Sequence, residues 1–233
     1  MHWSKLAIPV LAATFAGGYL AAAQPAPSAP AARFVVLLDA AHGGDDAGAR
    51  LDSGQLEKAV NLALSVRLRS LLAARGISVV TTRESDATVE QDRRAEIANR
   101  ANAAVCLSLH ASESGSGIHI FASSLAPAPP TRFAAWKTAQ AAWMPRSLAL
   151  AGILNSALTH AEFKVTFGRA PLFAVESMTC PALAIEIAPE RGPDNKITAE
   201  PDDPAYQARV SAALAAAVLE WRTEGWRTEV HEP

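Results

Sequence analysis

Two histidines and two glutamates lie where turns meet short apolar runs or the start of a helical pattern. His42 follows one apolar run in a turn that contains two glycines, and His110 ends another run. Glu57 stands in the first turn of a helical pattern, and Glu186 lies near the end of the apolar run 183–187. Two imidazoles and one carboxylate form a common ligand set for catalytic zinc, with a fourth position left for water. The second carboxylate would then be free for proton transfer.

The elements that position these residues follow from the spacing of apolar side chains. Short apolar runs predict buried strands, and amphipathic patterns predict helices between them. The strands are expected at residues 34–39, 77–82 and 104–110, and the helices at about 55–75 and 88–102, the second with a capping box of Thr88 and Gln91. This alternation predicts a parallel sheet with right-handed crossovers. Ligands collect at the carboxyl ends of such strands, so the four side chains are expected at one rim.

The second half of the chain is less regular but is expected to complete the same fold. Strands are predicted at 118–121 and 183–187, a helix from about Ser147, and a last helix that begins near Asp203 and Pro204. The predicted fold class is α/β, with a mostly parallel twisted sheet that has helices on both faces.

Residues 122–146 are the least regular part of the chain. Their first part, 126–130, is Pro-rich, and residues 133–143 could form a helix with Trp136 and Trp143 on one face. Both rings are expected to pack on the core. The alternatives are that the segment forms a wall of a groove beside the rim or a flap that gates it.

Taken singly, each of the four rim residues has a simpler interpretation. A histidine at a strand end is usually just solvated, and the helix dipole favours a glutamate in a first helical turn. Glu186 is harder to explain in this way, because a carboxylate between apolar neighbours needs a partner. The coincidence of all four at one rim is what indicates a site.

Other polar residues near the rim are expected to play smaller roles. His119 is interpreted as a structural histidine, and Arg169 as a solvated arginine. Glu190 is a rival general base that lies beyond the strand end. Asp45 or Asp46 could hold the second nitrogen of the turn histidine, as metal-bound histidines require, although capping of the loop explains them equally well.

The first residues have the features of an export signal. Lys5 precedes the uncharged stretch 6–23, which ends in three alanines, so residues 1–23 are predicted to be a signal peptide cleaved after Ala23. An uncleaved membrane anchor is the alternative. We expect a flexible lead-in at 24–32, a folded domain at 33–222 and a surface tail at 223–233. The protein would then be periplasmic or secreted, with no stable membrane insertion after cleavage.

Composition excludes some classes of partner and leaves the cysteines open. Half of the 233 residues are hydrophobic and the formal net charge is −2, so nothing suggests binding to nucleic acid. Cys106 and Cys180 lack the Cys-x-x-Cys spacing of a thiol metal or redox site. Two buried thiols are expected, and a disulfide is the alternative in an exported protein.

Several segments together resemble the zinc-dependent N-acetylmuramoyl-L-alanine amidases of bacterial cell walls. The resemblance spans about residues 34–220 and rests on 36–49, 57–62, Thr82-Arg83 with Asp86, Arg94 with 97–99, 108–112 and 181–186. It implies an amidase-like three-layer sandwich in which His42, Glu57 and His110 bind Zn²⁺ and Glu186 is the catalytic acid/base. The chain departs from the family pattern at Ala41, at Ser112 and in the loop 187–192, where the family usually has Gly, Asn and a different sequence.

The resemblance also implies a substrate and a reaction. Peptidoglycan would be cut at the amide bond between N-acetylmuramic acid and the L-alanine of the stem peptide. The alternatives are a zinc peptidase that acts within the stem peptide and a peptidoglycan-binding module without activity. A protein activator is possible in principle, and the sequence names none.

Overall fold

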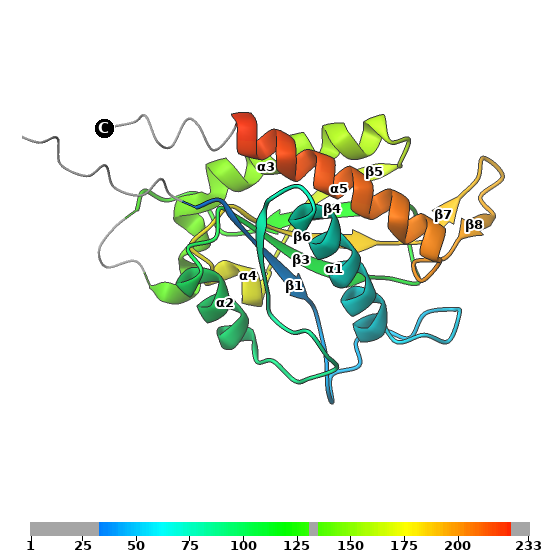
Figure 1. Ribbon diagram of the computed structural model, residues 1–233, viewed down its shortest axis with the longest axis horizontal. Coiled ribbons are helices and arrows are strands. Elements are labelled where there is room, and N and C mark those ends of the chain that lie inside the picture. The colour runs from blue at the N-terminus through cyan, green and yellow to red at the C-terminus, as the bar shows by residue number, and fades with distance from the viewer. Residues whose placement is uncertain (1–32, 131–134, 225–233) are drawn as a thin grey trace, which may run out of the picture. The chain divides into compact units, whose positions relative to one another are not determined.

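The computed structural model of the protein describes residues 33–130 and 135–224, within a unit that begins at Arg33. Its centre is a six-stranded sheet in the order β2-β1-β3-β6-β4-β5 (Figure 1). The strands are β1 Val35–Ala40, β2 Ser78–Thr81, β3 Val105–Ala111, β4 Ile118–Ser123, β5 Val165–Ala170 and β6 Ala182–Ile187. All neighbouring strands are parallel except β4 and β6, which run antiparallel. The expectation of a mostly parallel sheet is confirmed.

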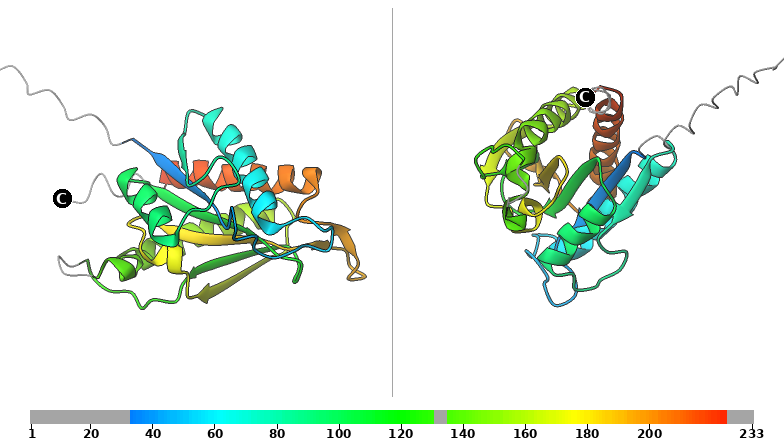
Figure 2. Two further views of the ribbon diagram at one scale, coloured as in Figure 1. Left: turned by 90° about the horizontal axis from the view of Figure 1, so that it is seen from below. Right: turned by 90° about the vertical axis from the view of Figure 1, so that its left-hand side faces the viewer.

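Helices cover both faces of this sheet, as expected. They are α1 Glu57–Ala73, α2 Gln91–Arg100, the short 3-10 helix η1 Trp136–Thr138, α3 Gln140–His160, α4 Phe173–Glu176 and α5 Pro204–Glu224. Helices α1, α3 and α5 pack on the larger apolar core, and α3 lies beside α5 (Figure 2). Helices α2 and α4 pack on a smaller cluster at the other face, which includes Leu37 and Cys106. Because side chains alternate along a strand, their neighbours Leu38 and Leu107 belong to the larger core.

The apolar faces predicted for the long helices are buried. In α1, Val60, Leu64, Leu68 and Leu72 are at most 3 % exposed. Helix α5 begins as expected, because Asp203 Oδ1 accepts hydrogen bonds from the amides of residues 205 and 206 at 2.9 and 2.8 Å. These helices fix the strand ends that carry the rim residues.

The predicted capping box of α2 is wrong. The residue before the helix is Glu90, and its side chain makes no capping hydrogen bond. The Thr88 hydroxyl instead accepts a hydrogen bond of 3.4 Å from the amide of Asp45. A threonine at capping distance thus serves the neighbouring His42 loop, which periodicity alone did not indicate.

Helix α3 begins seven residues earlier than the expected start at Ser147 and passes through Pro145. A proline inside a helix leaves the carbonyl four residues before it without a partner. Here that carbonyl is Ala141 O, and it accepts a hydrogen bond of 3.0 Å from the amide of Ala128 in the Pro-rich segment. The substitute donor satisfies this carbonyl, so the helix can extend on the N-terminal side of Pro145, before the expected start.

The helix expected over 133–143 is only partly present: residues 136–138 form a 3-10 turn and residues 140–143 begin α3, while 133 and 134 lie outside the described residues. Trp136 lies in η1 and Trp143 lies in α3, so the two rings belong to different elements. Trp136 is 53 % exposed, which excludes the expected packing of both rings on the core.

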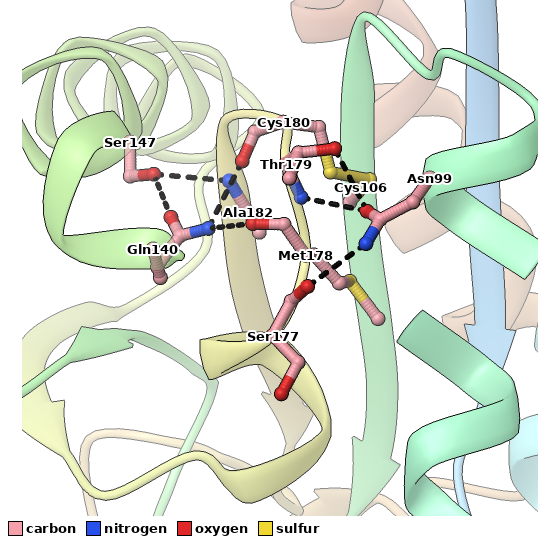
Figure 3. Close-up of a disulfide and its surroundings, with 9 residues drawn as sticks. All are labelled: Asn99, Cys106, Gln140, Ser147, Ser177, Met178, Thr179, Cys180 and Ala182. Carbon is pink, nitrogen blue, oxygen red and sulfur yellow. Dashed lines mark hydrogen bonds between the residues drawn. A yellow bond between two sulfur atoms is a disulfide. The ribbon is translucent and has the colours of Figure 1, made fainter. Parts of the chain in front are cut away.

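The structure corrects the expectation of two free thiols. Cys106 and Cys180 form a disulfide, and both residues are 1 % exposed (Figure 3). Cys180 lies just before β6, and Cys106 is aligned with Ala182 on the neighbouring strand. The Cα atoms are therefore 6.2 Å apart, within the usual range for a disulfide. The burial expected for both cysteines was taken to favour free thiols, but buried cysteines can be either free or disulfide-bonded.

The segment 177–182 around this disulfide is held from both sides (Figure 3). From α3, Gln140 donates hydrogen bonds to two of its carbonyls, and the Ser147 hydroxyl accepts one of 3.0 Å from the Ala182 amide. From α2, the side chain of Asn99 bonds to the segment through three hydrogen bonds. The start of β6, and with it the strand that carries Glu186, is thus fixed in position.

Some elements were not expected from the sequence. These are β5, α4 and a small antiparallel hairpin of β7 Glu190–Arg191 and β8 Ile197–Ala199. The predicted signal peptide, the lead-in at 24–32 and nearly all of the tail at 223–233 lie outside the described residues. Within the described part, no helix is both long and apolar enough to cross a membrane.

Candidate metal centre and active site

Three of the four rim residues meet beside the carboxyl ends of β1 and β3. His42 follows β1, Glu57 is the first residue of α1, and His110 is the next-to-last residue of β3. Glu57 Oε2 lies 3.2 Å from His42 Nε2, and Glu57 Oε1 lies 3.1 Å from His110 Nδ1. One ligand atom from each side chain lies within 4.8 Å of the other two. The structure therefore brings together two imidazoles and a carboxylate from distant parts of the chain.

This donor set fits a zinc ion. Ligand atoms about 2.0–2.2 Å from a tetrahedral metal are separated from one another by roughly 3.3 Å. The two measured contacts with Glu57 are close to that separation. Gly48 makes room for them, because a Cβ at this position would lie 2.6 Å from Glu57 Oε2 and 2.8 Å from His42 Cδ2. With its φ of +65° as well, position 48 requires glycine.

Both histidines have a partner at the other ring nitrogen. His42 Nδ1 lies 2.9 Å from Asp46 Oδ2, and the amide of Gly48 donates to the second oxygen of the same carboxylate at 3.1 Å. His110 Nε2 lies 3.4 Å from the hydroxyl of Ser108. Such partners fix the ring orientation and tautomer of metal-binding histidines. Of the two aspartates considered for this role, the structure places Asp46 at His42.

Two largely buried arginines hold the main chain around His42. His42 has a φ of +62°, a conformation that non-glycine residues rarely adopt. Arg94 donates a hydrogen bond of 2.8 Å to the His42 carbonyl. Arg83 donates to the carbonyls of Ala40 and Ala41 at 2.8 and 3.0 Å. These guanidinium groups satisfy the carbonyls of the turn and so stabilise its unusual conformation.

A buried carboxylate connects this turn to β3. Asp39 is 1 % exposed and accepts hydrogen bonds from Arg94 at 2.6 Å, from Thr82 at 2.7 Å and from Ser108 at 2.8 Å. A buried charge is tolerated when it is paired and hydrogen-bonded in this way. Since Ser108 also contacts the ring of His110, one network supports both histidines.

The glycine turn after His42 is held from α1. The Gly44 amide donates to Asp86 at 2.7 Å, and Lys58 Nζ donates to the Gly44 carbonyl at 2.6 Å and to Asp86 at 2.7 Å. A Cβ at Gly44 would lie 2.0 Å from the hydroxyl of Thr88, so the turn packs directly on that residue.

The electrostatics of the cluster favour a cation. Burial disfavours the ionised form of Glu57, but hydrogen bonds with His110, His42 and the Ala49 amide outweigh it and hold the pKa of Glu57 well below its usual range. The hydrogen bond with Glu57 raises the pKa of His42 against the effect of burial, and Asp46 adds to the rise. The raised pKa of His42 reflects the nearby carboxylates of Glu57 and Asp46, and the lowered pKa of Glu57 keeps it ionised, as a metal ligand must be.

Glu186 lies beside this cluster on the neighbouring strand. The register of β3 and β6 pairs His110 with Glu186, and that of β4 and β6 pairs His119 with Glu186. Residues paired across strands share a sheet face, so the three side chains form a row. Glu186 Oε1 lies 3.3 Å from His119 Nδ1, and the Glu186 side chain is 32 % exposed. The partner that this carboxylate needed is therefore His119.

A cavity of about 610 Å³ opens beside the two histidines, between the sheet and the start of α2. Asp46, His42 and His110 line one side, and Lys137 from η1 and Ala174 from α4 also line it. The cavity is large enough for part of an extended substrate.

The remaining candidates have other partners. Arg169 is exposed, in line with the expected solvated arginine, and it also donates hydrogen bonds to the carbonyls of residues 123 and 125. Glu190 forms a bidentate pair with Arg209 at 2.8 and 3.1 Å and points toward α5. It is therefore poorly placed to rival Glu186. His119 was expected to be purely structural, and its contact with Glu186 was missed.

Comparison with known proteins gives a consistent result. A family model described as N-acetylmuramoyl-L-alanine amidase matches residues 36–220. N-acetylmuramoyl-L-alanine amidase AmiA of Escherichia coli K12 is 42 % identical over 77 residues, which are 33 % of this chain and 27 % of AmiA. The uncharacterized protein YqiI of Bacillus subtilis is 33 % identical over 114 residues, which are 47 % of this chain and 50 % of YqiI. The match therefore spans only about a quarter of AmiA and half of YqiI.

Solved structures share the fold. The catalytic domain of CwlV, an N-acetylmuramoyl-L-alanine amidase of Bacillus (Paenibacillus) polymyxa, has a TM-score of 0.63 at 24 % identity, covering 82 % of this chain and 98 % of that one. AmiC2 of Nostoc punctiforme has a TM-score of 0.62 at 23 % identity, with the same coverage. At these identities the likeness concerns the fold.

Proposed function

The chain belongs to the N-acetylmuramoyl-L-alanine amidase family, and on this premise we propose that it hydrolyses the amide bond between N-acetylmuramic acid and the L-alanine of the peptidoglycan stem peptide. One observation carries the proposal. The ligand atoms of two imidazoles and a carboxylate lie within 4.8 Å of one another, and a second carboxylate, Glu186, is paired with His110 on the neighbouring strand. That is the set of groups that metal-assisted amide hydrolysis needs.

In this proposal His42, Glu57 and His110 hold zinc. When bound there, zinc would polarise the scissile carbonyl and lower the pKa of a bound water to about 7. Asp46 keeps His42 Nε2 turned toward Glu57 by holding its Nδ1. Ser108, fixed by Asp39, does the same for the opposite edge of His110. The site would thus be ordered before substrate arrives.

Glu186 is proposed as the general acid/base. His119 contacts its Oε1, and within residues 33–130 and 135–224 no hydrogen bond is formed by its Oε2. That oxygen would take the proton of the attacking water and then deliver it to the nitrogen of the leaving alanine. His119 would keep the carboxylate turned toward the cluster, which makes it a positioning residue.

Two further features support details of this function. The buried disulfide supports export to an oxidising compartment, as the predicted signal peptide at 1–23 requires. Lys137 lines the cavity beside His42 and His110, which supports the part of segment 122–146 around η1 as a wall of the substrate groove.

Digestion of purified peptidoglycan by the mature protein with zinc tests the function. Mass analysis should find free stem peptides that begin with alanine, with intact glycan strands. Shortened stems that remain on the sugar would identify a peptidase instead. Binding to the wall without any product would identify a binding module.

A further inference from the structure

A second, smaller cavity of about 530 Å³ lies on the other side of Glu186 from the metal cluster. It is lined by Gly115, Ser116, His119, Lys164, Thr166, Arg191 and Asn195. The strand register connects it to the site, because His119 is paired with Glu186 on one side and with Thr166 on the other. One row of side chains therefore runs from the metal cluster through Glu186 into this cavity.

The β7–β8 hairpin presents Arg191 to the cavity. Glu190 and Arg191 are neighbours on β7, and their side chains bond to different parts of the molecule. Glu190 faces α5 and is held by Arg209 in a bidentate ion pair. Arg209 in turn lies over the ring of Phe163, 4.9 Å from its centroid. This anchor leaves Arg191 on the side of the site.

Arg191 is held close to His119 and keeps donors to spare. Its Nε donates to the Gly115 carbonyl at 3.1 Å and its Nη1 to the Asn195 carbonyl at 3.0 Å. Gly115 also lies against the histidine ring, since a Cβ there would be 2.6 Å from His119 Cε1. A guanidinium has five N–H donors, so three of them remain for a ligand.

Neither cation of this cavity forms a direct ion pair with a carboxylate within the part of the chain that the structure describes, although Glu200 interacts with Arg191 at longer range. Lys164 is exposed, and its ammonium group forms no ion pair or hydrogen bond with residues 33–130 and 135–224. On the same hairpin, by contrast, Lys196 pairs with Asp194 at 3.1 Å. Two unpaired cations in one concave site are suited to an anion, and an arginine can bind a carboxylate with two parallel hydrogen bonds.

We propose that this basic pocket of Lys164 and Arg191 binds a carboxylate of the stem peptide, an inference that rests on the proposed amidase function. Stem peptides carry carboxylates beyond their alanine, whereas the lactyl carboxyl of the sugar is consumed in the scissile amide. The charged part of the substrate therefore belongs on the side of Lys164 and Arg191. The sugar then occupies the larger cavity beside His42 and His110, and the scissile bond lies between them at Glu186.

Kinetics with paired substrates test this orientation. Two synthetic muramoyl peptides would be identical except that the carboxylates after the alanine are free in one and are carboxamides in the other. We expect the wild-type protein to hydrolyse the free acid with a kcat/KM at least about tenfold higher, the scale of a hydrogen-bonded charge. In Lys164→Ala and Arg191→Gln the preference should shrink, mainly through KM for the free acid, and in the double variant it should vanish.

Lys196→Ala is the matched control. It removes a cation from the same hairpin, and the Lys196 side chain does not line the cavity. It should keep the full preference. Lys164→Ala has no hydrogen bond to lose, so its effect cannot come from a disturbed hairpin. Equal hydrolysis of both substrates by the wild type, or an unchanged preference in the double variant, would overturn the inference and leave the amidase function standing.

A binding measurement separates this inference from the proposed function. If neither substrate is hydrolysed in the presence of zinc, the function fails, and calorimetric titration with the two free peptides decides about the pocket. The proposed pocket is supported if the wild-type protein binds the free acid in a salt-sensitive way and the double variant does not. Equal binding of acid and amide, or binding unchanged in the variant, contradicts it.

Discussion

The two sides of the candidate site are held in different ways. The side of His42, Glu57 and His110 is supported by buried charges, with Asp39 1 % exposed and largely buried arginines bonded to the main chain. On the other side, the Glu186 side chain is 32 % exposed, and among the described residues its polar contact is with His119. A metal site tolerates little change in the positions of its ligands, whereas a carboxylate that faces the substrate can change its position when the substrate binds.

The difference also concerns which parts of the chain depart from the family pattern. The segments that hold the metal-side network are among those that resemble the family, whereas the loop 187–192, which carries Arg191, departs from it. The rigid side would therefore supply chemistry common to the family, and the less constrained side would set what this chain accepts as substrate.

Removal of a ligand should break the metal side completely. In His110→Ala, two donors remain for zinc, so we expect bound zinc to fall from about one ion per chain to a small fraction and hydrolysis to be lost. Metal analysis by mass spectrometry after dialysis measures this. Full zinc occupancy in the variant would refute the assignment of His110.

Removal of the buried arginine should have the next largest effect, on stability. Arg94→Met leaves Asp39 as a buried carboxylate without its ion-pair partner, which should lower the free energy of unfolding by about 3–5 kcal/mol. Urea denaturation measures the change. The adjacent Arg93→Met removes only an exposed pair with Glu96 and should stay within about 1 kcal/mol of the wild type. Similar values for both variants would show that the network does not support the fold.

Loss of the proposed general base should affect catalysis and spare the metal. Glu186→Gln keeps the size of the side chain but cannot take a proton, so hydrolysis should fall at least about a hundredfold with zinc content unchanged. Glu190→Gln, altered at the rival carboxylate, weakens the anchor of the β7–β8 hairpin and should raise KM, but without a hundredfold loss of kcat. The reverse result would move the role to Glu190.

The smallest effect is expected from the partner of a ligand. Asp46→Ala removes the group that holds His42 Nδ1 and should weaken zinc affinity by about 10- to 100-fold. Competition with a zinc chelator measures the affinity. Asp45→Ala is the control, because its side chain does not contact the ring, and it should retain wild-type affinity. Equal losses of zinc affinity in the two variants would show that the negative charge of the loop matters, and not the orientation of the His42 ring.

The sequence predicted that His42, Glu57 and His110 meet, because simple rules apply to their positions. His42 and His110 follow or end parallel strands, and Glu57 begins a helix, so the carboxyl-end rule places all three at one rim. The same rule places Glu186 beside them. The fold class followed from the alternation of strands and helices, and the structure confirms it.

The remaining contacts arise from features that local patterns do not carry. His119 stands near the start of β4, and it reaches the rim only because β4 runs antiparallel to β6. A rule about carboxyl ends of strands cannot find such a residue. The roles of Asp39 and Arg94 depend on a contact between residues 55 positions apart, although a charged residue at the end of an apolar run was a visible signal.

The disulfide has one more consequence, for a protein exposed to proteases. Cys106 and Cys180 are 74 positions apart, and the intervening chain includes β4, α3, β5 and α4. A single cut anywhere in that stretch would leave both pieces covalently joined, with β3 and β6 still cross-linked next to each other. Nicked protein would migrate as one band without reductant and as two with it. The strands that carry His110 and Glu186 would thus stay covalently joined after such a cut. Without the disulfide, the same cut would leave two separate polypeptides.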